Sequence, residues 1–378
     1  MIRNSLFSCI GADDPSLSFS QAYIPNSNGT EVVTYGSACY CGQYSDDSSF
    51  FYTCTQDFRV QMYDVNKAPL RDVEGPEVAS SSFRLRGARL YRTDYDGPRH
   101  STLQLRRSIT GRHCSWTITD ANLSADNQWM IYSSFTPFVH LVPTTDVAKG
   151  TEGTGTGARA NPADDQQVML DMSAIENGRR YSHGEGLFSV RFSGNSKEII
   201  AGARGGSIYV YDIEARQRVL AVDGHRDDVN SVCFADVGSS NMLLSGSDDA
   251  TVRIWDRRSL SQGKPAGILR GHRHGLTYVS PKGDGRYCVS NGKDNTCKLW
   301  DMRQMSSSIG SGSAADSWYN SREDSSLMTF KGHAVCKTLI RCHFSPIATT
   351  GQSYIYSGSG DGRIHVSCLE VRIEGIMC

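Results

Sequence analysis

The sequence predicts an all-β fold, a β-propeller in which repeated four-stranded blades are arranged in a ring. The main observation is a repeat: residues 244–258 and 289–303 both end in Trp-Asp-x-Arg, and their Trp-Asp pairs begin at Trp255 and Trp300, about 45 residues apart. A Gly-His pair precedes each Trp-Asp pair by about 30 residues. A period of roughly 40 to 45 residues between such pairs is typical of propeller blades, which bury their faces only against neighbouring blades.

Six units can be aligned, four of them on an Asp that stands six residues before the Trp position. Alternating apolar runs within the units fit short, half-buried strands. The first unit has Tyr63-Asp64 in place of Trp-Asp, and the last has Ser367-Cys368 there. We therefore predict a WD-repeat β-propeller with six recognisable blades of a seven-blade array, the last blade missing or partial. Four units are marked by their turn Asp, at Asp57, Asp249, Asp294 and Asp361, and the two weaker units span residues 116–142 and 187–212.

A propeller absorbs a chain of 378 residues as one closed array, so we expect one domain over residues 19–368. An N-terminal tail would occupy residues 1–18, and an atypical tail residues 369–378. Three insertions are expected, at about 67–107, 147–183 and 304–330.

The three insertions differ in composition. The first is Arg-rich, and a solvated loop is favoured over an RNA-binding one because few aromatic residues are interleaved for base stacking. The second is Gly-rich at residues 150–157 but is not followed by the Lys-Ser or Lys-Thr of a phosphate loop. The third is Ser-rich, which makes it a plausible modification site.

The C-terminal sequence suggests a shortened or alternatively ended propeller, because no further complete unit follows residue 366. An edge strand of the sixth blade would then be unpaired unless the N-terminal stretch Phe19 to Tyr35 covers it. We expect an open array rather than a closed six-blade ring.

Composition excludes several classes of protein. The 39 basic and 40 acidic side chains give a net charge of -1, which provides no general attraction to nucleic acid or membrane. No apolar run approaches the roughly 18 to 20 residues that span a bilayer, and residues 1–10 make a poor secretory signal. The 12 cysteines fall mostly in strand-like segments and are expected to be reduced thiols. Cys39 and Cys41 are expected on one face of a strand.

The spacing within a unit predicts a hydrogen-bonded network. The Asp belongs to a tight turn and can accept a proton from the His that enters the blade, while the hydroxyl and the indole N–H extend the chain of bonds. We interpret these residues as structural, not as metal ligands or catalytic groups. They are His225, Ser245, Asp249, Trp255, His272, Ser290, Asp294, Trp300, His333, Ser357 and Asp361.

No motif points to catalysis, to a metal or to a cofactor. The sequence has no GxSxG elbow and no HExxH pair, and the regularly spaced acids are explained by blade turns. We expect a protein that is not an enzyme, although propellers do host active sites on one face.

The Trp-Asp-x-Arg endings place Arg258 and Arg303 just beyond the third strand of adjacent blades. Their guanidinium groups are expected side by side on one face, where they could bind carboxylates or backbone carbonyls of a partner. The alternative is that each Arg pairs within its own blade. The residues assigned to partner binding are Asp256, Arg258, Asp301 and Arg303.

A WD repeat with this ending resembles the box of substrate receptors of cullin-4 RING ubiquitin ligases. Longer strings are similar to one group of these receptors, adaptor-associated factor eleven, also called WD-repeat protein twenty-three. The likeness runs from about Ser20 to Val366. The strings are at residues 23–29, 224–230, 324–329 and 339–346.

The resemblance implies a non-catalytic substrate receptor of nucleus and cytoplasm. One face would dock to the ligase adaptor, the damaged-DNA-binding protein, and through it to cullin-4. Another face would present a protein substrate, whose identity the sequence does not reveal, for ubiquitination and proteasomal degradation. Two alternatives stay open: a WD-repeat scaffold in RNA processing or chromatin, and an RNA binder that uses the loop from Arg84 to Arg107.

Overall fold

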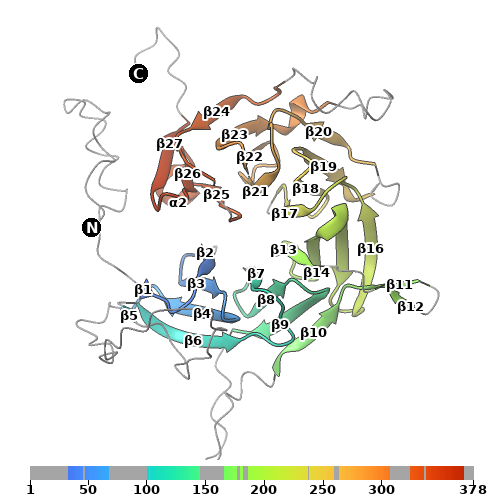
Figure 1. Ribbon diagram of the computed structural model, residues 1–378, viewed down its shortest axis with the longest axis vertical. Helices are drawn as coiled ribbons and strands as arrows, with labels where there is room; N and C mark the ends of the chain where they lie inside the picture. The colour runs from blue at the N-terminus through green and yellow to red at the C-terminus, as the bar shows by residue number, and fades with distance from the viewer. Residues whose placement is uncertain are drawn as a thin grey trace, which may run out of the picture.

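Figure 1 shows the computed structural model, in which the blades surround a central channel. The predicted tails, apart from Leu369, lie outside the residues that the structure describes. The same holds for the stretch from Phe19 to residue 32, the Gly-rich segment 150–157 and most of the Arg-rich and Ser-rich insertions. The described residues are 33–45, 47–67, 100–101, 103–144, 166–176, 179–181, 186–236, 238–258, 264–306, 324–335 and 338–369.

In the described residues the fold is an all-β propeller with five four-stranded blades and a three-stranded sixth blade, which confirms the predicted fold class. All strands within a blade pair antiparallel with their neighbours, and the first strand of each blade lies nearest the channel (Figure 1).

The strands follow in chain order. Blade 1 contains β2 (Cys39–Tyr44), β3 (Phe50–Thr55), β4 (Arg59–Asp64) and β6 (Gln104–Thr110). Blade 2 contains β7 (Ile118–Leu123), β8 (Trp129–Ser134), β9 (Phe138–Pro143) and β10 (Val168–Asp171). Blade 3 contains β13 (Leu187–Phe192), β14 (Glu198–Ala203), β15 (Ser207–Asp212) and β16 (Gln217–Asp223).

Blade 4 contains β17 (Val229–Phe234), β18 (Met242–Ser247), β19 (Val252–Asp256) and β20 (Gly267–Leu269). Blade 5 contains β21 (Leu276–Pro281), β22 (Tyr287–Gly292), β23 (Thr296–Asp301) and β24 (Met328–Lys331). Blade 6 contains β25 (Cys342–Phe344), β26 (Tyr354–Gly358) and β27 (Ile364–Cys368), with the short helix α2 (Ile347–Thr350) between the first two strands. Two small antiparallel pairs lie outside the blades: β1 (Val33–Thr34) with β5 (His100–Ser101), and β11 (Ala174–Glu176) with β12 (Arg179–Tyr181).

The hydrophobic core is divided among the interfaces between blades. Ile200 and Ile208 of blade 3, for example, pack with Val229, Val232 and Trp255 of blade 4. Because both faces of a blade are covered, its middle strands are buried over most of their length, as β18 shows. This arrangement explains why single units would not be stable alone.

The array is open between blade 6 and blade 1. Among the described residues, neither β25, β26 nor β27 pairs with a strand of blade 1, and β27 is an outer strand without the fourth strand of the other blades (Figure 1). The prediction of six recognisable blades of a seven-blade array, whose last blade is missing or partial, is therefore confirmed among the described residues.

Each expected insertion includes all or part of the outermost strand of a blade. β6 begins inside the first, the second contains β10, β11 and β12, and β24 begins inside the third. The sequences of these outermost strands lack a strong alternation of apolar residues, because an outermost strand pairs along only one of its edges. Each insertion connects a third strand with a fourth strand.

The inner strand carries the same irregularity in blades 1 to 5. The antiparallel register of the first strand slips by one residue near its start, which is a β-bulge. In blade 1 the bulge separates Cys39, which is exposed, from Cys41, which is buried, so the expectation that both lie on one face is wrong. The bulged residues are Tyr40, Thr119, Phe188, Asn230 and Thr277.

Candidate functional site

In blade 4 the four residues of the predicted network form one chain of hydrogen bonds. His225 Nδ1 lies 2.8 Å from Asp249 Oδ2, and His225 Nε2 lies 2.6 Å from Ser245 Oγ. The Trp255 indole N–H donates to the same hydroxyl oxygen at 2.8 Å. Because a carboxylate only accepts, His225 Nδ1 donates to Asp249, and the Ser245 hydroxyl donates to Nε2. Every member is therefore satisfied, and Trp255 is fully buried.

The Asp in this chain also shapes the turn between β18 and β19. Asp249 Oδ1 accepts from the Thr251 backbone N–H at 3.1 Å and from its hydroxyl at 2.6 Å, while Ala250 adopts a φ of 63°. Burial alone would raise the pKa of Asp249, but its bonds with His225 and Thr251 hold that pKa well below its usual range. Burial in turn lowers the pKa of His225 despite its bond to Asp249. A neutral His225 imidazole that faces an ionised Asp249 carboxylate agrees with both of these pKa shifts.

Blade 5 repeats this geometry. His272 Nδ1 lies 3.0 Å from Asp294 Oδ2, and its Nε2 lies 2.8 Å from Ser290 Oγ. The Trp300 indole N–H donates to Ser290 Oγ at 2.7 Å. These contacts agree with a structural role for the strong repeats.

The network predicted in blade 6 is wrong. His333 Nε2 donates to Asn291 Oδ1 of blade 5 at 2.6 Å instead of bonding to Ser357, and Asn291 Nδ2 donates to Ser357 Oγ at 3.2 Å. Asp361 is exposed and accepts from the Arg363 backbone N–H. The physical reason is that Ser367 occupies the Trp position, so no indole donor holds Ser357 in place.

Arg258 and Arg303 lie at the same end of adjacent blades. Each follows the third strand of an antiparallel blade, β19 or β23, and therefore lies at the end where third strands connect to fourth strands. Both side chains are exposed. The expected common face is thus present, but the two guanidinium groups differ in their partners.

Arg258 pairs within its own blade, which is the alternative kept open above. Its Nε donates to Asp256 Oδ1 at 3.0 Å and its Nη2 to Asp256 Oδ2 at 2.6 Å, although the side chain stays 80% exposed. The bonds from Arg258 hold the pKa of Asp256 at about 2. An exposed pair of this kind contributes little to stability, because water solvates and screens both charges.

Arg303 is not held in this way. Asp301, its counterpart to Asp256, is buried and accepts from Arg286 Nε at 3.1 Å and Nη2 at 2.9 Å. Only the backbone N–H of Arg303 bonds to Asp301, at 3.0 Å. In the part of the chain that the structure describes, the Arg303 guanidinium makes no hydrogen bond or ion pair. With respect to the described residues, Arg303 therefore keeps its side-chain donors available on this face.

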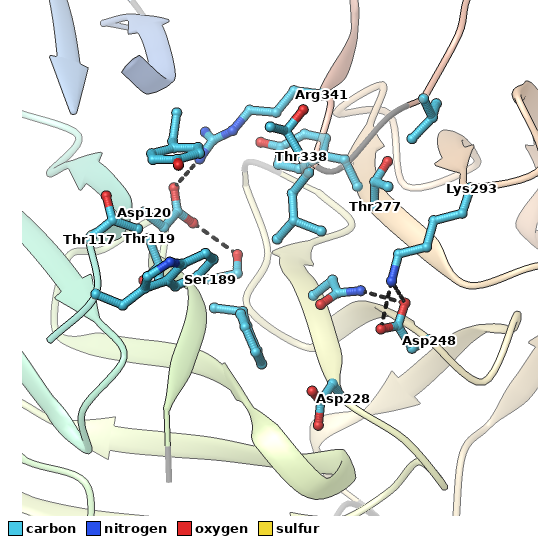
Figure 2. Close-up of a pocket in the computed structure, with 17 residues that line it drawn as sticks. Thr117, Thr119, Asp120, Ser189, Asp228, Asp248, Thr277, Lys293, Thr338 and Arg341 are labelled. Carbon is cyan, nitrogen blue, oxygen red and sulfur yellow. Dashed lines mark hydrogen bonds and ion pairs between the residues drawn. The ribbon is translucent and has the colours of Figure 1, made fainter. Parts of the chain in front are cut away.

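The opposite end of the blades contains a cavity of about 430 Å³ at the channel (Figure 2). The five bulged residues of the inner strands all line it, because a bulge turns a side chain out of the regular alternation. Trp116 adds an exposed indole, and its φ of 65° is unusual for a bulky residue. Lys293 pairs with Asp248 at the rim, at 2.6 Å.

A buried ionic cluster beside this cavity was missed from the sequence. Asp120 on β7 is 1% exposed and accepts from Arg341 Nη2 at 2.7 Å, and from Arg191 Nη1. Arg191 also donates to the Tyr278 hydroxyl at 2.7 Å, and Arg341 to Gln43 at 3.2 Å. Figure 2 shows the bond between Asp120 and Arg341. The cluster links blades 1, 2, 3, 5 and 6 across the channel. A charged residue inside a short strand-like segment, as at Asp120, was the available signal.

We find no helix in the described residues that could span a membrane. The nine described cysteines are all free. No group of three or more potential metal-ligating side chains was found in that part of the chain.

Comparisons with known proteins agree with this geometry. The family "WD domain, G-beta repeat" matches residues 177–212, 216–256 and 263–301, which cover blades 3, 4 and most of blade 5. The LEC14B protein of Lithospermum erythrorhizon is 37% identical over 360 residues, covering 91% of this chain and 66% of that protein. The LEC14B homolog of Prunus armeniaca is 34% identical, with the same coverage. The DDB1- and CUL4-associated factor 11 homolog of Caenorhabditis elegans is 30% identical over 369 residues, covering 91% of this chain and 56% of that protein.

The repeats, the ring of blades and these matches define a WD-repeat β-propeller protein. More narrowly, the chain is similar to LEC14B proteins and to the DDB1- and CUL4-associated factor 11 homologs. It spans less than two thirds of the length of these relatives.

Proposed function

We propose that this chain is a non-catalytic substrate receptor of a cullin-4 RING ubiquitin ligase. It would dock to the DDB1 adaptor with the face that carries Arg258 and Arg303, and present proteins for ubiquitination and proteasomal degradation. The observation that carries the proposal is the similarity over 91% of the chain to a protein named a DDB1- and CUL4-associated factor. It is combined with the exposed Arg303, whose guanidinium has no hydrogen-bond or ion-pair partner among the described residues, on a face shared by two blades.

The two arginines contribute unequally to this docking. Arg303 can donate to a carboxylate or to backbone carbonyls without first breaking a bond, and Arg286 fixes Asp301 so that the turn carrying Arg303 is held in place. Arg258 must share or release Asp256 before it can make the same contacts. Arg303 is therefore the stronger anchor of the pair.

A binding experiment tests the docking. The full chain and its Arg258→Ala/Arg303→Ala variant are compared for capture of purified DDB1, with matched thermal midpoints as proof of folding. Arg273→Ala serves as the control. This exposed Arg precedes β21, the first strand of blade 5, and so lies at the end of the blade opposite Arg303. Loss of capture only in the double variant supports the proposal, and undiminished capture by the double variant contradicts it.

The second candidate is a WD-repeat interaction scaffold outside any ligase, and failure of the unmodified chain to capture DDB1 favours it. The third, an RNA binder, would use the segment from Arg84 to Arg107, most of which lies outside the described residues. RNA binding would weaken steeply with salt and disappear when that segment is deleted. We also propose a nuclear and cytoplasmic location, which fractionation of cells expressing the tagged chain tests directly.

A further inference from the structure

A row of four aromatic rings joins blades 1, 2 and 3 at the central cavity. The ring centroids of Tyr40 and Trp116 are 6.1 Å apart, those of Trp116 and Phe135 also 6.1 Å, and those of Phe135 and Phe188 5.6 Å. Tyr40, Trp116 and Phe188 line the cavity itself. The row therefore gives the cavity an aromatic wall, which neither the blade networks nor the proposed docking face uses.

Trp116 is the most exposed member of this row, and its backbone holds it in that position. The residue is 53% exposed and has a φ of 65°. The Thr117 backbone N–H donates to the Ser115 carbonyl at 2.8 Å, which closes a three-residue turn around Trp116, and the Phe135 backbone N–H donates to the same carbonyl at 3.2 Å. Strained conformations of bulky residues cluster at ligand-binding sites, and exposed tryptophans are enriched at interfaces.

Blade 4 contributes two carboxylates to the same cavity, and they differ in their partners. Asp248 pairs with Lys293 at 2.6 Å and accepts from Asn230 Nδ2 at 2.8 Å. Asp228 accepts from the Gly205 backbone N–H at 2.8 Å and makes no ion pair with any described residue. Figure 2 shows dashed lines at Asp248 but none at Asp228. Within the described part of the chain, Asp228 is thus the cavity carboxylate without a cationic partner.

The charges of the cavity favour a cation from outside over an anion. Its positive groups already have partners: Lys293 pairs with Asp248, and Arg341 pairs with Asp120. A guanidinium group would find Asp228 as a counter-charge, whereas a phosphate would be repelled by it. The aromatic row also accepts a cation, because the Arg204 guanidinium lies 5.8 Å from the centre of the Phe135 ring. A peptide with a basic side chain therefore fits this site better than a nucleic acid does.

We propose that the cavity binds an extended peptide segment in which an arginine stands two residues from a large apolar side chain. Residues two apart point to the same side of an extended chain, so both can enter one cavity of about 430 Å³. The apolar side chain packs on Trp116 and Phe188, and the guanidinium pairs with Asp228. Because the cavity and the docking face lie at opposite ends of the blades, the segment would belong to the protein that the ligase receives. That biological role rests on the proposed function, but the binding itself does not.

Retention of the full chain on immobilised peptide pools tests the proposal. Each pool contains blocked decapeptides that are random except at the fourth and sixth positions, which carry Arg and Phe, Glu and Phe, or Arg and Ser, in both orders. We expect the Arg-Phe pools to retain roughly 10-fold more chain than the other pools, because each of those lacks one of the two contacts. Equal retention by all pools, or stronger retention by the Glu-Phe pools, overturns the proposal.

Two variants assign the contacts to residues. Asp228→Asn should lose the preference for Arg over Glu and keep the preference for Phe over Ser, whereas Trp116→Ala should show the reverse. The matched controls are Asp361→Asn, an exposed carboxylate, and Trp129→Ala, a 42% exposed indole, and neither residue lines the cavity. Both controls should behave like the unmodified chain. An unchanged preference for Arg in a folded Asp228→Asn variant overturns the pairing, and the pools with the unmodified chain decide the proposal if a variant does not fold.

Two further measurements separate this site from other interpretations. Capture of DDB1 is measured on the same preparation: capture without any preference among the pools overturns the peptide site alone, and a preference without capture leaves the site and defeats the proposed function. A labelled single-stranded RNA provides the other comparison. If the chain binds this RNA more tightly than the Arg-Phe pools, and Trp116→Ala abolishes that binding, the site belongs to a nucleic acid and the proposal is overturned.

Discussion

Replacing Asp120 by Asn tests whether the ionic cluster holds the open array together. The carboxylate accepts from Ser189 Oγ at 2.9 Å and from the Val190 backbone N–H at 3.0 Å. It also accepts from Arg191 of blade 3 and Arg341 of blade 6. An amide has one acceptor oxygen, so at least one arginine would face an N–H₂ group. The variant keeps the shape of the side chain and removes the single negative charge.

The expected cost follows from the burial of the charges that remain. The Arg191 and Arg341 side chains are only 10% and 13% exposed, so they stay buried without a counter-charge. Breaking a buried pair in this way costs about 3 to 5 kcal/mol, a large part of a typical total stability of roughly 5 to 15 kcal/mol. We expect the free energy of unfolding of Asp120→Asn to fall by that amount.

Urea unfolding followed by tryptophan fluorescence measures the change. Asp361→Asn is the control, because that carboxylate is exposed, and it should unfold like the unmodified chain. The double variant Asp120→Asn/Arg341→Met should recover part of the loss, since it removes one unpaired charge. A loss below about 1 kcal/mol for Asp120→Asn would refute the role of the cluster, because a buried pair is expected to cost several times more.

Three further predictions concern the blade networks. Trp300→Ala should lower the free energy of unfolding by about 3 to 5 kcal/mol, because the fully buried indole leaves a cavity; a urea midpoint equal to that of the unmodified chain would contradict this. Ser245→Ala should cost about 1 to 3 kcal/mol in the same assay, since the His225 and Trp255 nitrogens lose their partner, whereas Ser357→Ala should cost less because no indole depends on it. Lowering the pH should destabilise the chain in two stages. The pKa values of His225, Asp249 and Asp294 are all depressed in the folded state. Each group therefore contributes fully to folding stability above its unfolded pKa, about 6.5 for His and about 3.9 for Asp, and this contribution is lost as the pH falls below that value. The thermal midpoint should therefore fall between pH 7 and 5 and again below pH 4, and a midpoint constant from pH 7 to 3 would contradict the assigned charge states.

The repeat pattern was sufficient to predict the blades, because the residues that define it act locally. His225, Ser245, Asp249 and Trp255 lie within one blade and its entering turn, so their spacing along the chain determines their contacts. The same rule failed for His333, because its partner Asn291 belongs to the preceding blade. A contact between blades leaves no fixed spacing in the sequence.

The candidate site was predicted in part for a similar reason. The position of Arg258 and Arg303 follows from the end of a strand, but their pairing depends on side chains elsewhere. Arg286 of blade 5 satisfies Asp301, whereas in blade 4 Arg258 itself pairs with Asp256. The channel cluster around Asp120 was invisible to the repeat pattern, because Arg191 and Arg341 meet it only when the blades are arranged in a ring.

The affinity of the full chain for purified DDB1 tests the central claim most directly, measured by calorimetry for the unmodified protein, Arg258→Ala and Arg303→Ala. We expect Arg303→Ala to weaken binding by roughly 30-fold, the effect of a typical interface hot spot, and Arg258→Ala to weaken it less because Asp256 already occupies its guanidinium. Equal affinity of Arg303→Ala and the unmodified chain would contradict the docking face proposed for this protein.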